Sequence, residues 1–407
     1  MFRTRHFTAK ACLLAAFALA ITVPLVAAQA KGERVLHSFD PDTDGFLPSG
    51  LIRDRDGNLY GTADARGQKD FRGVGTVFGL AANGTFTVFY RFKTKLRDGK
   101  YPIGGLARDK AGNLYGATSE GGGGYDVCEF GCGTVFRVAP DGTETVLHAF
   151  AGSDGDLPVS TPLQDGSGNF YGTTEYGGAD GDGVVFRLAP DGTLSVLHSF
   201  DGSDGAIPQG DLLADKKGNL YGATFDGGSG NCAAGCGVIY KLAPGGTLSV
   251  LHSFQGLSDG SSPDGPLVRD ADGNLYGTTV GGGSTCGDGD GCGVAFKLAP
   301  DGTLTVLHVF TDGSDGGYPE GGVIADGAGN LYGVTVDGGL QYCQAGCGVV
   351  FKLAPDGTET VLRSFDSGKG GFHPEYGLTM DKGGNLYGTT WEGGANGDGT
   401  IFEVKTK

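Results

Sequence analysis

The apolar and polar positions of this chain follow a pattern that occurs seven times, at steps of 50 to 56 residues. Each copy holds four short runs rich in Tyr, Val, Phe and Thr, which are residue types that favour pleated strands. No stretch after residue 30 keeps a helical period. The phrase Gly-Asn-Leu-Tyr-Gly, once with Phe for Leu, marks every copy, and its asparagines are Asn58, Asn113, Asn169, Asn219, Asn274, Asn330 and Asn385. The pattern therefore predicts four strands in each copy.

Turn signals separate these strands. In the fifth copy, the segment 270–273 reads Asp-Ala-Asp-Gly, with Asp first and Gly fourth, as a type I turn followed by a left-handed residue requires. Pro300-Asp301-Gly302 supplies a second tight hairpin between the third and fourth strands. We therefore expect each copy to fold as a four-stranded antiparallel sheet.

The two ends of the repeat array indicate how the sheets are arranged. Four-stranded units of about 50 residues are typical of propeller blades, and an open solenoid of hairpins is the alternative. Residues 34–39 match the fourth strand of a copy before any copy has begun, and residues 399–404 match a third strand that lacks a fourth. The first segment can complete the last sheet only in a closed ring, which also leaves no exposed sheet edge. We predict an all-β, seven-bladed β-propeller, closed by the N-terminal strand in the last blade.

The first thirty residues have the features of a secretory signal peptide. Arg3, Arg5 and Lys10 precede an apolar run, which ends in the small-residue site Ala28-Gln29-Ala30. A membrane anchor is the alternative. The predicted division is a signal peptide at 1–30 and one propeller at 31–407, with a closing strand at 33–39 and blades at 48–92, 103–150, 158–200, 209–254, 264–310, 320–365 and 375–407.

Composition narrows the class of protein. The chain has 81 Gly and 16 Pro among 407 residues, but no Gly-X-Y period runs through it, which excludes collagen. Hydrophobic residues make up 39% of the chain, which is enough for a packed core. The net charge is −17, so the surface would repel a nucleic-acid backbone. No later run is long enough to cross a bilayer, so we expect no membrane span in the mature chain.

Eight cysteines remain when Cys12 in the leader is set aside, and they form four close pairs. An even number of cysteines in an exported chain indicates disulfides. A four-thiolate zinc site is the alternative, but the pairs belong to different copies and have three or five residues between them rather than two. The predicted disulfides are Cys128–Cys132, Cys232–Cys236, Cys286–Cys292 and Cys343–Cys347.

The repeated phrase, the Gly-Gly loop and the run Gly-Val-Val-Phe-Lys-Leu-Ala-Pro-Asp-Gly-Thr together resemble the Gloeo/Verruco (GloVer) tandem repeat. The resemblance covers nearly all of residues 50–407. It implies an exported bacterial protein, often with a C-terminal sorting anchor. That tail is absent from this sequence, so we expect a secreted, periplasmic or cell-surface protein. The resemblance implies no catalytic residues.

Binding is expected on the propeller face that carries the loops between blades and between the second and third strands, because these loops are long, acidic and Gly-rich. One of them, residues 40–45, reads Asp-Pro-Asp-Thr-Asp-Gly and resembles the first half of a calcium loop. Position twelve of such a loop would be Leu51, which is not a ligand. Asp40, Asp42 and Asp44 are therefore a candidate calcium site, and a solvated turn is the alternative.

Histidines recur at one position of the fourth strand, where Tyr90 and Arg363 take the place in two copies. Because equivalent positions around a ring lie far apart, we interpret these histidines as structural. They are His37, His148, His198, His252 and His308.

A catalytic site in such a ring requires residues that break the repeat, because an acid and a base need different environments. The candidates form no recognisable pair, and we expect the acids among them to be surface residues. The candidates are Glu129, Glu175, Glu320, His373, Glu375 and Trp391, and the segments 66–72 and 372–376 depart most from the pattern.

The sequence therefore favours a secreted, non-enzymatic propeller that binds an extracellular glycan or protein through its acidic loop face. One alternative is a hydrolase or lyase of extracellular polysaccharide with carboxylates at the channel mouth, which predicts that these carboxylates gather in one cleft. Another is a purely structural cell-surface repeat. No cofactor is expected, apart from the candidate calcium.

Overall fold

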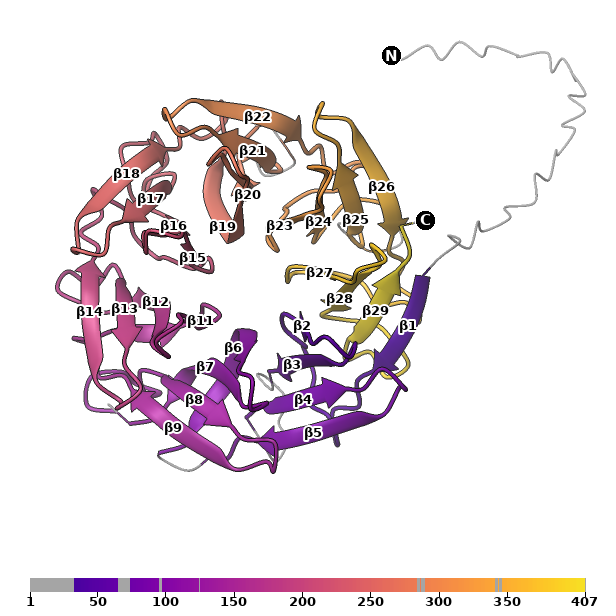
Figure 1. The fold of residues 1–407 in the computed structure, drawn as a ribbon. Coiled ribbons are helices and arrows are strands. Elements are labelled where there is room, and N and C mark those ends of the chain that lie inside the picture. The colour runs from indigo at the N-terminus through magenta and orange to yellow at the C-terminus, as the bar shows by residue number, and fades with distance from the viewer. Residues whose placement is uncertain are drawn as a thin grey trace, which may run out of the picture. The chain divides into compact units, whose positions relative to one another are not determined.

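The structure is a computed structural model that describes residues 33–64, 74–94, 97–123, 125–283, 286, 290–340, 343 and 346–406. These residues form seven antiparallel sheets around a central channel, as the predicted seven-bladed propeller requires (Figure 1). The predicted signal peptide and the segment 66–72 lie outside the described residues. Within the described part of the chain, no helix is long and apolar enough to cross a membrane.

Each blade has its first strand at the channel and its fourth at the rim. Blade 1 comprises β2 (Ile52–Arg53), β3 (Leu59–Ala63), β4 (Thr76–Leu80) and β5 (Phe86–Arg91). Blade 2 comprises β6 (Gly99–Arg108), β7 (Leu114–Gly121), β8 (Thr134–Val138) and β9 (Glu144–Ala149). In blade 3 the inner strand is split, giving β10 (Asp156–Pro158), β11 (Leu163–Gln164), β12 (Phe170–Tyr176), β13 (Val184–Leu188) and β14 (Leu194–Ser199).

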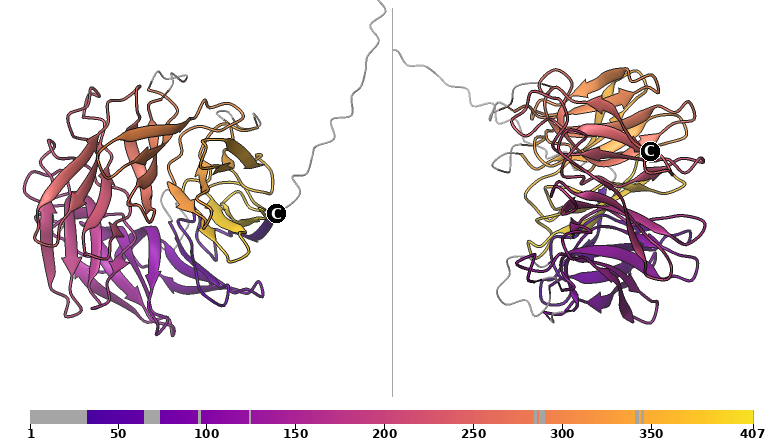
Figure 2. Two further views of the ribbon diagram at one scale, coloured as in Figure 1. Left: turned by 45° about the horizontal axis from the view of Figure 1, so that its top comes forward. Right: turned by 90° about the vertical axis from the view of Figure 1, so that its left-hand side faces the viewer.

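The remaining blades repeat this order, and the turned views in Figure 2 show the sheets placed side by side around one axis. Blade 4 comprises β15 (Leu213–Ala214), β16 (Leu220–Thr224), β17 (Val238–Leu242) and β18 (Leu248–Ser253). Blade 5 comprises β19 (Ser261–Arg269), β20 (Leu275–Gly281), β21 (Val294–Leu298) and β22 (Leu304–Val309). Blade 6 comprises β23 (Val323–Ala325), β24 (Leu331–Thr335), β25 (Val349–Leu353) and β26 (Glu359–Ser364).

Blade 7 joins the two ends of the described chain. It contains β27 (Thr379–Met380), β28 (Leu386–Thr390) and β29 (Thr400–Val404), with β1 (Glu33–Ser38) as its outer strand. β1 pairs antiparallel with β29, and Val35 lies opposite Phe402. The predicted closure of the ring by the N-terminal strand is therefore confirmed.

The repeated phrase forms the first hairpin of each blade through one carboxylate. In blade 4, Asp215 accepts hydrogen bonds from the backbone and side-chain nitrogens of Asn219, at 3.0 and 2.8 Å, and from the hydroxyl of Tyr221, at 3.2 Å. Burial alone would raise the pKa of Asp215, but these bonds and that from the Lys217 backbone lower it to about 2. The same contacts recur in all seven blades, at Asp54, Asp109, Asp165, Asp215, Asp270, Asp326 and Asp381.

The second Gly of the phrase is required by an aromatic ring on the third strand. A Cβ built on Gly116 would lie 2.6 Å from the ring of Phe136, too close for any side chain. The equivalent glycine in the other blades faces the equivalent aromatic ring in the same way. The glycine leaves room for the tip of the ring against the second strand.

The hydrophobic core lies between neighbouring blades. A Phe at the end of each outer strand is almost completely buried and meets the third-strand ring of the next blade edge to face, or nearly so. Phe39 contacts Phe78 across the closing junction, with ring centroids 5.1 Å apart. The other six contacts are Phe92–Phe136, Phe150–Phe186, Phe200–Tyr240, Phe254–Phe296, Phe310–Phe351 and Phe365–Phe402.

The histidines of the outer strands are structural, as expected. His37 Nε2 lies 2.8 Å from Asp44 Oδ2, and Tyr90 makes the same contact with Asp98. At the junction between blades 6 and 7, Arg363 takes the place of the histidine and Gly370 takes the place of the aspartate. The remaining pairs are His148–Asp154, His198–Asp204, His252–Asp259 and His308–Asp315.

The cysteines pair as their spacing predicts, in the loops between second and third strands. Their Cα atoms are 5.1 to 5.7 Å apart in the four disulfides. Blades 1, 3 and 7 contain no cysteine. The disulfides therefore brace single loops and do not hold the ring together.

One blade departs from the aromatic pattern. Tyr240 replaces the Phe of the other six, and its hydroxyl is buried with no hydrogen-bond partner among the described residues. Burial also raises its pKa. We expect Tyr240→Phe to increase the free energy of unfolding by about 1 kcal/mol, because it removes an unpaired buried donor.

The reverse change at the matching position is the control. Phe296→Tyr in blade 5 should lower stability by about 1–3 kcal/mol. Urea unfolding followed by fluorescence measures the free energy of unfolding of both variants. An unchanged or lower stability of Tyr240→Phe would contradict the expectation.

Candidate functional site

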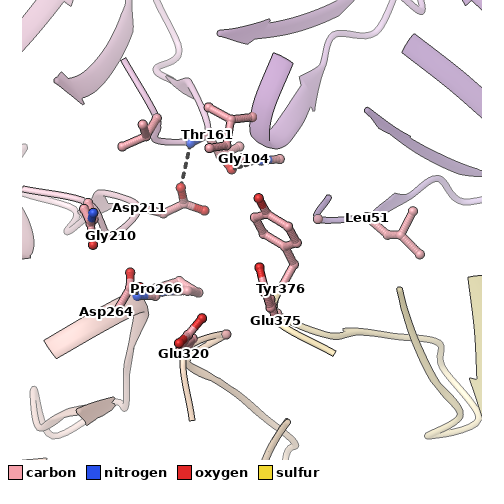
Figure 3. Close-up of a pocket in the computed structure, with 18 of the residues that line it drawn as sticks. Leu51, Gly104, Thr161, Gly210, Asp211, Asp264, Pro266, Glu320, Glu375 and Tyr376 are labelled. Atoms are coloured by element: carbon pink, nitrogen blue, oxygen red, sulfur yellow. Dashed lines mark hydrogen bonds between the residues drawn. The ribbon is translucent and has the colours of Figure 1, made fainter. Parts of the chain in front are cut away.

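A cavity of about 310 Å³ lies in the central channel, and residues from all seven blades line it (Figure 3). Its lining residues lie in β6 and β19, just before or at the start of the other inner strands, and near the end of β12. The cavity therefore lies toward the face that carries the inter-blade loops, which we call the loop face. Convergence of all blades at one cavity makes this the main candidate site.

A strained bend lies near the start of the inner strand in each blade. The residue before a proline has a positive φ of 53 to 57° in every blade, although none of these residues is Gly. This conformation is costly for ordinary residues and persists only where the surroundings enforce it. One enforcing contact links neighbouring blades: His373 N donates to Cys347 O at 3.1 Å. The seven residues are Leu47, Tyr101, Leu157, Ile207, Ser262, Tyr318 and His373.

The residue after the proline faces the cavity in six blades, and its type changes around the ring. Blades 2 and 3 supply Ile103 and Val159, and blade 4 supplies Gln209. Blades 5, 6 and 7 supply the acids Asp264, Glu320 and Glu375. In blade 1 the equivalent Ser49 is buried, and Leu51 lines the cavity in its place. The wall is therefore apolar on one side and acidic on the other.

Glycines behind this position bring the inner strands close together. A Cβ on Gly321 would lie 2.9 Å from Glu375 O, and one on Gly265 would lie 2.7 Å from Glu320 O. Because backbones of adjacent blades touch here, their acidic side chains converge on one small volume.

Hydrogen bonds fix the other polar groups of the wall. Thr161 N donates to Asp211 Oδ1 at 2.6 Å, and Gly105 N donates to Thr161 Oγ1 at 3.0 Å. Gln209 Nε2 donates to Glu175 Oε1 at 3.0 Å. These contacts link blades 2, 3 and 4 across the rim of the cavity. Figure 3 shows Asp211, Asp264, Glu320 and Glu375 around one space, with the Tyr376 ring beside them.

The acids of the wall resist ionisation. Burial raises the pKa of Asp264 to about 6, and the charges of Glu175 and Asp211 add to the rise. A hydrogen bond from Gly265 N acts in the opposite direction and lowers this pKa. Burial followed by the charges of Asp264 and Asp337 raises the pKa of Glu320 to about 7.

Glu375 shows the largest rise. Burial, then the charges of Glu320, Asp264 and Glu392, raise its pKa to about 9. Burial also raises the pKa of Asp211, against the hydrogen bonds from Thr161. At neutral pH the wall therefore holds protons that a positive ligand could displace.

A histidine adjoins this acidic side. His373 Nε2 lies 3.7 Å from Asp337 Oδ1, and His373 Nδ1 lies 3.7 Å from Glu392 Oε1. Burial raises the pKa of Asp337, and His373 opposes that rise. The other six blades have no histidine at this position.

The structure brings together only some of the candidates named from the sequence. Glu175, Glu320 and Glu375 line the cavity, whereas we expected them to be surface acids. Glu129 is exposed in a disulfide loop, and Trp391 Nε1 is buried without a partner among the described residues. Sequence reasoning missed Asp211, Asp264 and Gln209, and it included Tyr376 only as part of the segment 372–376. An alignment of the seven copies on their prolines would have shown the change from apolar to acidic residues.

Asp44 is the counterpart of the aspartates that pair with outer-strand histidines. Its carboxylate also accepts from the Asp40 backbone nitrogen at 3.2 Å and from the Thr43 hydroxyl at 2.9 Å. Asp40 Oδ1 accepts from Asp42 N at 3.0 Å. These bonds account for the turn, and calcium at Asp40, Asp42 and Asp44 stays a prediction.

A second cavity, of about 460 Å³, opens among the tight hairpins of blades 1 and 2. Four cations line it together with three aspartates, so its net charge is small. These residues are Arg53, Arg55, Arg108, Lys110, Asp54, Asp56 and Asp109.

The raised pKa values make stability depend on pH in a defined direction. Glu320 and Glu375 ionise in the unfolded chain near pH 4.5 but stay protonated in the folded protein until about pH 7 and 9. Their contribution to stability is therefore lost as pH rises between 5 and 9. We expect Glu375→Gln to raise stability at pH 9 by about 1–3 kcal/mol and to change it little at pH 5.

Melting temperatures at pH 5, 7 and 9 test this expectation. Exposed Glu129 is the control, since Glu129→Gln should match the unmodified protein at each pH. A Glu375→Gln variant that parallels the unmodified protein between pH 5 and 9 would show that Glu375 is not held protonated.

Comparison with known proteins agrees with the fold. Three overlapping matches to the Gloeobacter/Verrucomicrobia repeat cover residues 23–161, 125–289 and 233–407. No curated protein matches the sequence significantly.

Similar solved structures include the extracellular domain assigned to the hybrid two-component system BT3049 of B. thetaiotaomicron, with a TM-score of 0.56, 12% identity, and coverage of 92% of this chain and 41% of that one. PorZ, a bacterial surface component of the type-IX secretion system of Porphyromonas gingivalis, has a TM-score of 0.53, 14% identity, and coverage of 91% and 48%. The gluconolactonase XC5397 of Xanthomonas campestris has a TM-score of 0.43, 18% identity, and coverage of 74% and 85%.

This chain therefore spans less than half the length of the first two proteins, and at such identities the likeness concerns the fold. The repeat matches together extend from residue 23 to the last residue. The chain belongs to the Gloeobacter/Verrucomicrobia repeat family.

Proposed function

We propose that this protein is an extracellular binding propeller that holds a small organic cation in the channel cavity. The observation that carries the proposal is the convergence of Asp211, Asp264, Glu320 and Glu375 on the wall of one cavity. The proposal moves the expected binding site from the outer acidic loops to the centre of the same face.

Two carboxylates of the outer loops are less suited to a ligand because they already have partners. Asp154 and Asp204 are bonded to outer-strand histidines and to backbone nitrogens of their own loops. The cavity acids have raised pKa values because they are buried and because their charges repel one another. A cation among them would relieve that repulsion and compensate for their burial.

An organic cation fits the spacing better than a bare metal ion. Three potential ligand atoms lie within 4.8 Å of one another, within the described residues, only at Cys128, Cys132 and Asp156. Those two cysteines are joined in a disulfide. No three cavity carboxylates are thus that close together. A guanidinium group is larger than a bare ion and carries N–H donors that point in several directions, so it is better matched to such spacing.

Four disulfides support an extracellular or cell-surface location, because such bonds persist in oxidising compartments. Secretion through the leader at residues 1–30 is part of the proposal. Ligands that reach this protein would then be small molecules or side groups of polymers outside the cytoplasm.

Titration calorimetry with guanidinium chloride at millimolar, non-denaturing concentrations and constant ionic strength tests the proposal. This probe stays charged at every pH used, so the affinity should rise between pH 5 and 9 as the carboxylates ionise. Glu320→Gln and Glu375→Gln should each weaken binding roughly 3- to 10-fold at pH 8.

Binding at pH 7.5 should also release protons, which appears as a dependence of the measured heat on the ionisation enthalpy of the buffer. Glu129→Gln is the control and should bind as the unmodified protein does. Absence of saturable binding at pH 8, or binding that the two cavity variants leave unchanged, would refute the proposal.

Polysaccharide hydrolysis or elimination is the second candidate. It requires carboxylates that gather in one cleft and differ in pKa, and Asp264 and Glu375, at about 6 and 9, meet that requirement. In this case Glu375 would donate a proton and Asp264 would accept one. Incubation of the protein with a panel of glycans, followed by chromatography of the products, tests this candidate. We expect Glu375→Gln to abolish turnover. If the native protein is inactive, these substrates are excluded.

A further inference from the structure

The cavity has a second wall that a bare cation would not use. Ile103 and Val159 occupy the position that carries Gln209, Asp264, Glu320 and Glu375 in the following blades. Leu51, Ile52 and Leu378 extend this apolar surface. The residue after the inner-strand proline is thus apolar in two successive blades and acidic in three.

The backbone keeps the two walls facing each other. Ile103 lies opposite Ala117 of β7, and Asp264 lies opposite Thr278 of β20, so the two side chains leave their strands at the same register. The prolines before them, Pro102 and Pro263, are buried and follow residues held at positive φ. The difference between the walls therefore comes from side-chain type alone.

We propose that the ligand is an amphipathic ammonium, with its charged group among Asp264, Glu320 and Glu375 and an alkyl or aryl group against Ile103 and Val159. This inference rests on the proposed function and specifies its ligand class. A short apolar group suits a cavity of about 310 Å³, which is near the lower end for small-molecule sites.

The two walls contribute to binding in different ways. The acids contribute charge, which every member of an ammonium series shares, whereas burial of each added methylene contributes a separate hydrophobic increment. An amphipathic ligand is therefore recognised by affinity that grows with chain length, and a simple cation is not.

The test is calorimetry at pH 8 with methyl-, ethyl-, propyl-, butyl- and hexylammonium chloride. We expect the affinity to rise about three- to fourfold with each methylene until the apolar wall is covered, and then to level off. Ile103→Ser should reduce the increment per methylene and leave methylammonium binding nearly unchanged. Glu375→Gln should weaken all members by a similar factor.

Val159→Ser is a second apolar-wall variant in case Ile103→Ser folds poorly. Val196→Ser is the matched control, because Val196 lies on the outer strand β14 and is 41% exposed. Binding that is sensitive to Glu375→Gln but independent of chain length would overturn the amphipathic ligand and leave the cation site standing. An increment that both wall variants leave unchanged would overturn it as well. If no member binds, the proposed function fails too.

Discussion

The packing of a phenylalanine from each outer strand against the aromatic ring of the next blade supports the rest of the structure. These rings are almost completely buried, and hydrophobic clusters at the blade junctions form around them. The closing contact, Phe39 against Phe78, is the same as the others although β1 is far from blade 7 in sequence. Because the same aromatic contact is made at every blade junction, the junction that closes the ring needs no different packing.

The repeated hairpins hold the blades in register for this packing. An aspartate that binds Asn and Tyr fixes the first hairpin, and a glycine beneath the third-strand ring sets the spacing of the strands. The hairpin contacts and the strand spacing account for most of the repeated residues. Positions that do not take part are free to differ between blades, and the residue after the inner-strand proline is one of them.

The channel site consists of these differences. A symmetric ring of seven glutamates would repel itself, and a ring of seven isoleucines would fill the channel with apolar side chains. The asymmetric wall places partly protonated acids opposite an apolar surface. Burial, followed by the charges of neighbouring acids, raises the pKa values of Asp264, Glu320 and Glu375 to different levels although the three occupy equivalent positions.

The sequence by itself determined the architecture, because each blade is specified by local turns and a short repeated phrase, and because the third strand at one end needs the fourth strand at the other. It also determined the disulfides, whose partners are close neighbours in the chain. The site was different: Glu320 and Glu375 were singled out as departures from the repeat, but Asp211 and Asp264 were not. Residues 50 or more positions apart meet at the channel only when the ring closes, and both burial and mutual repulsion of their charges depend on that meeting. Only the tertiary structure could therefore decide that these acids share one cavity with Ile103 and Val159.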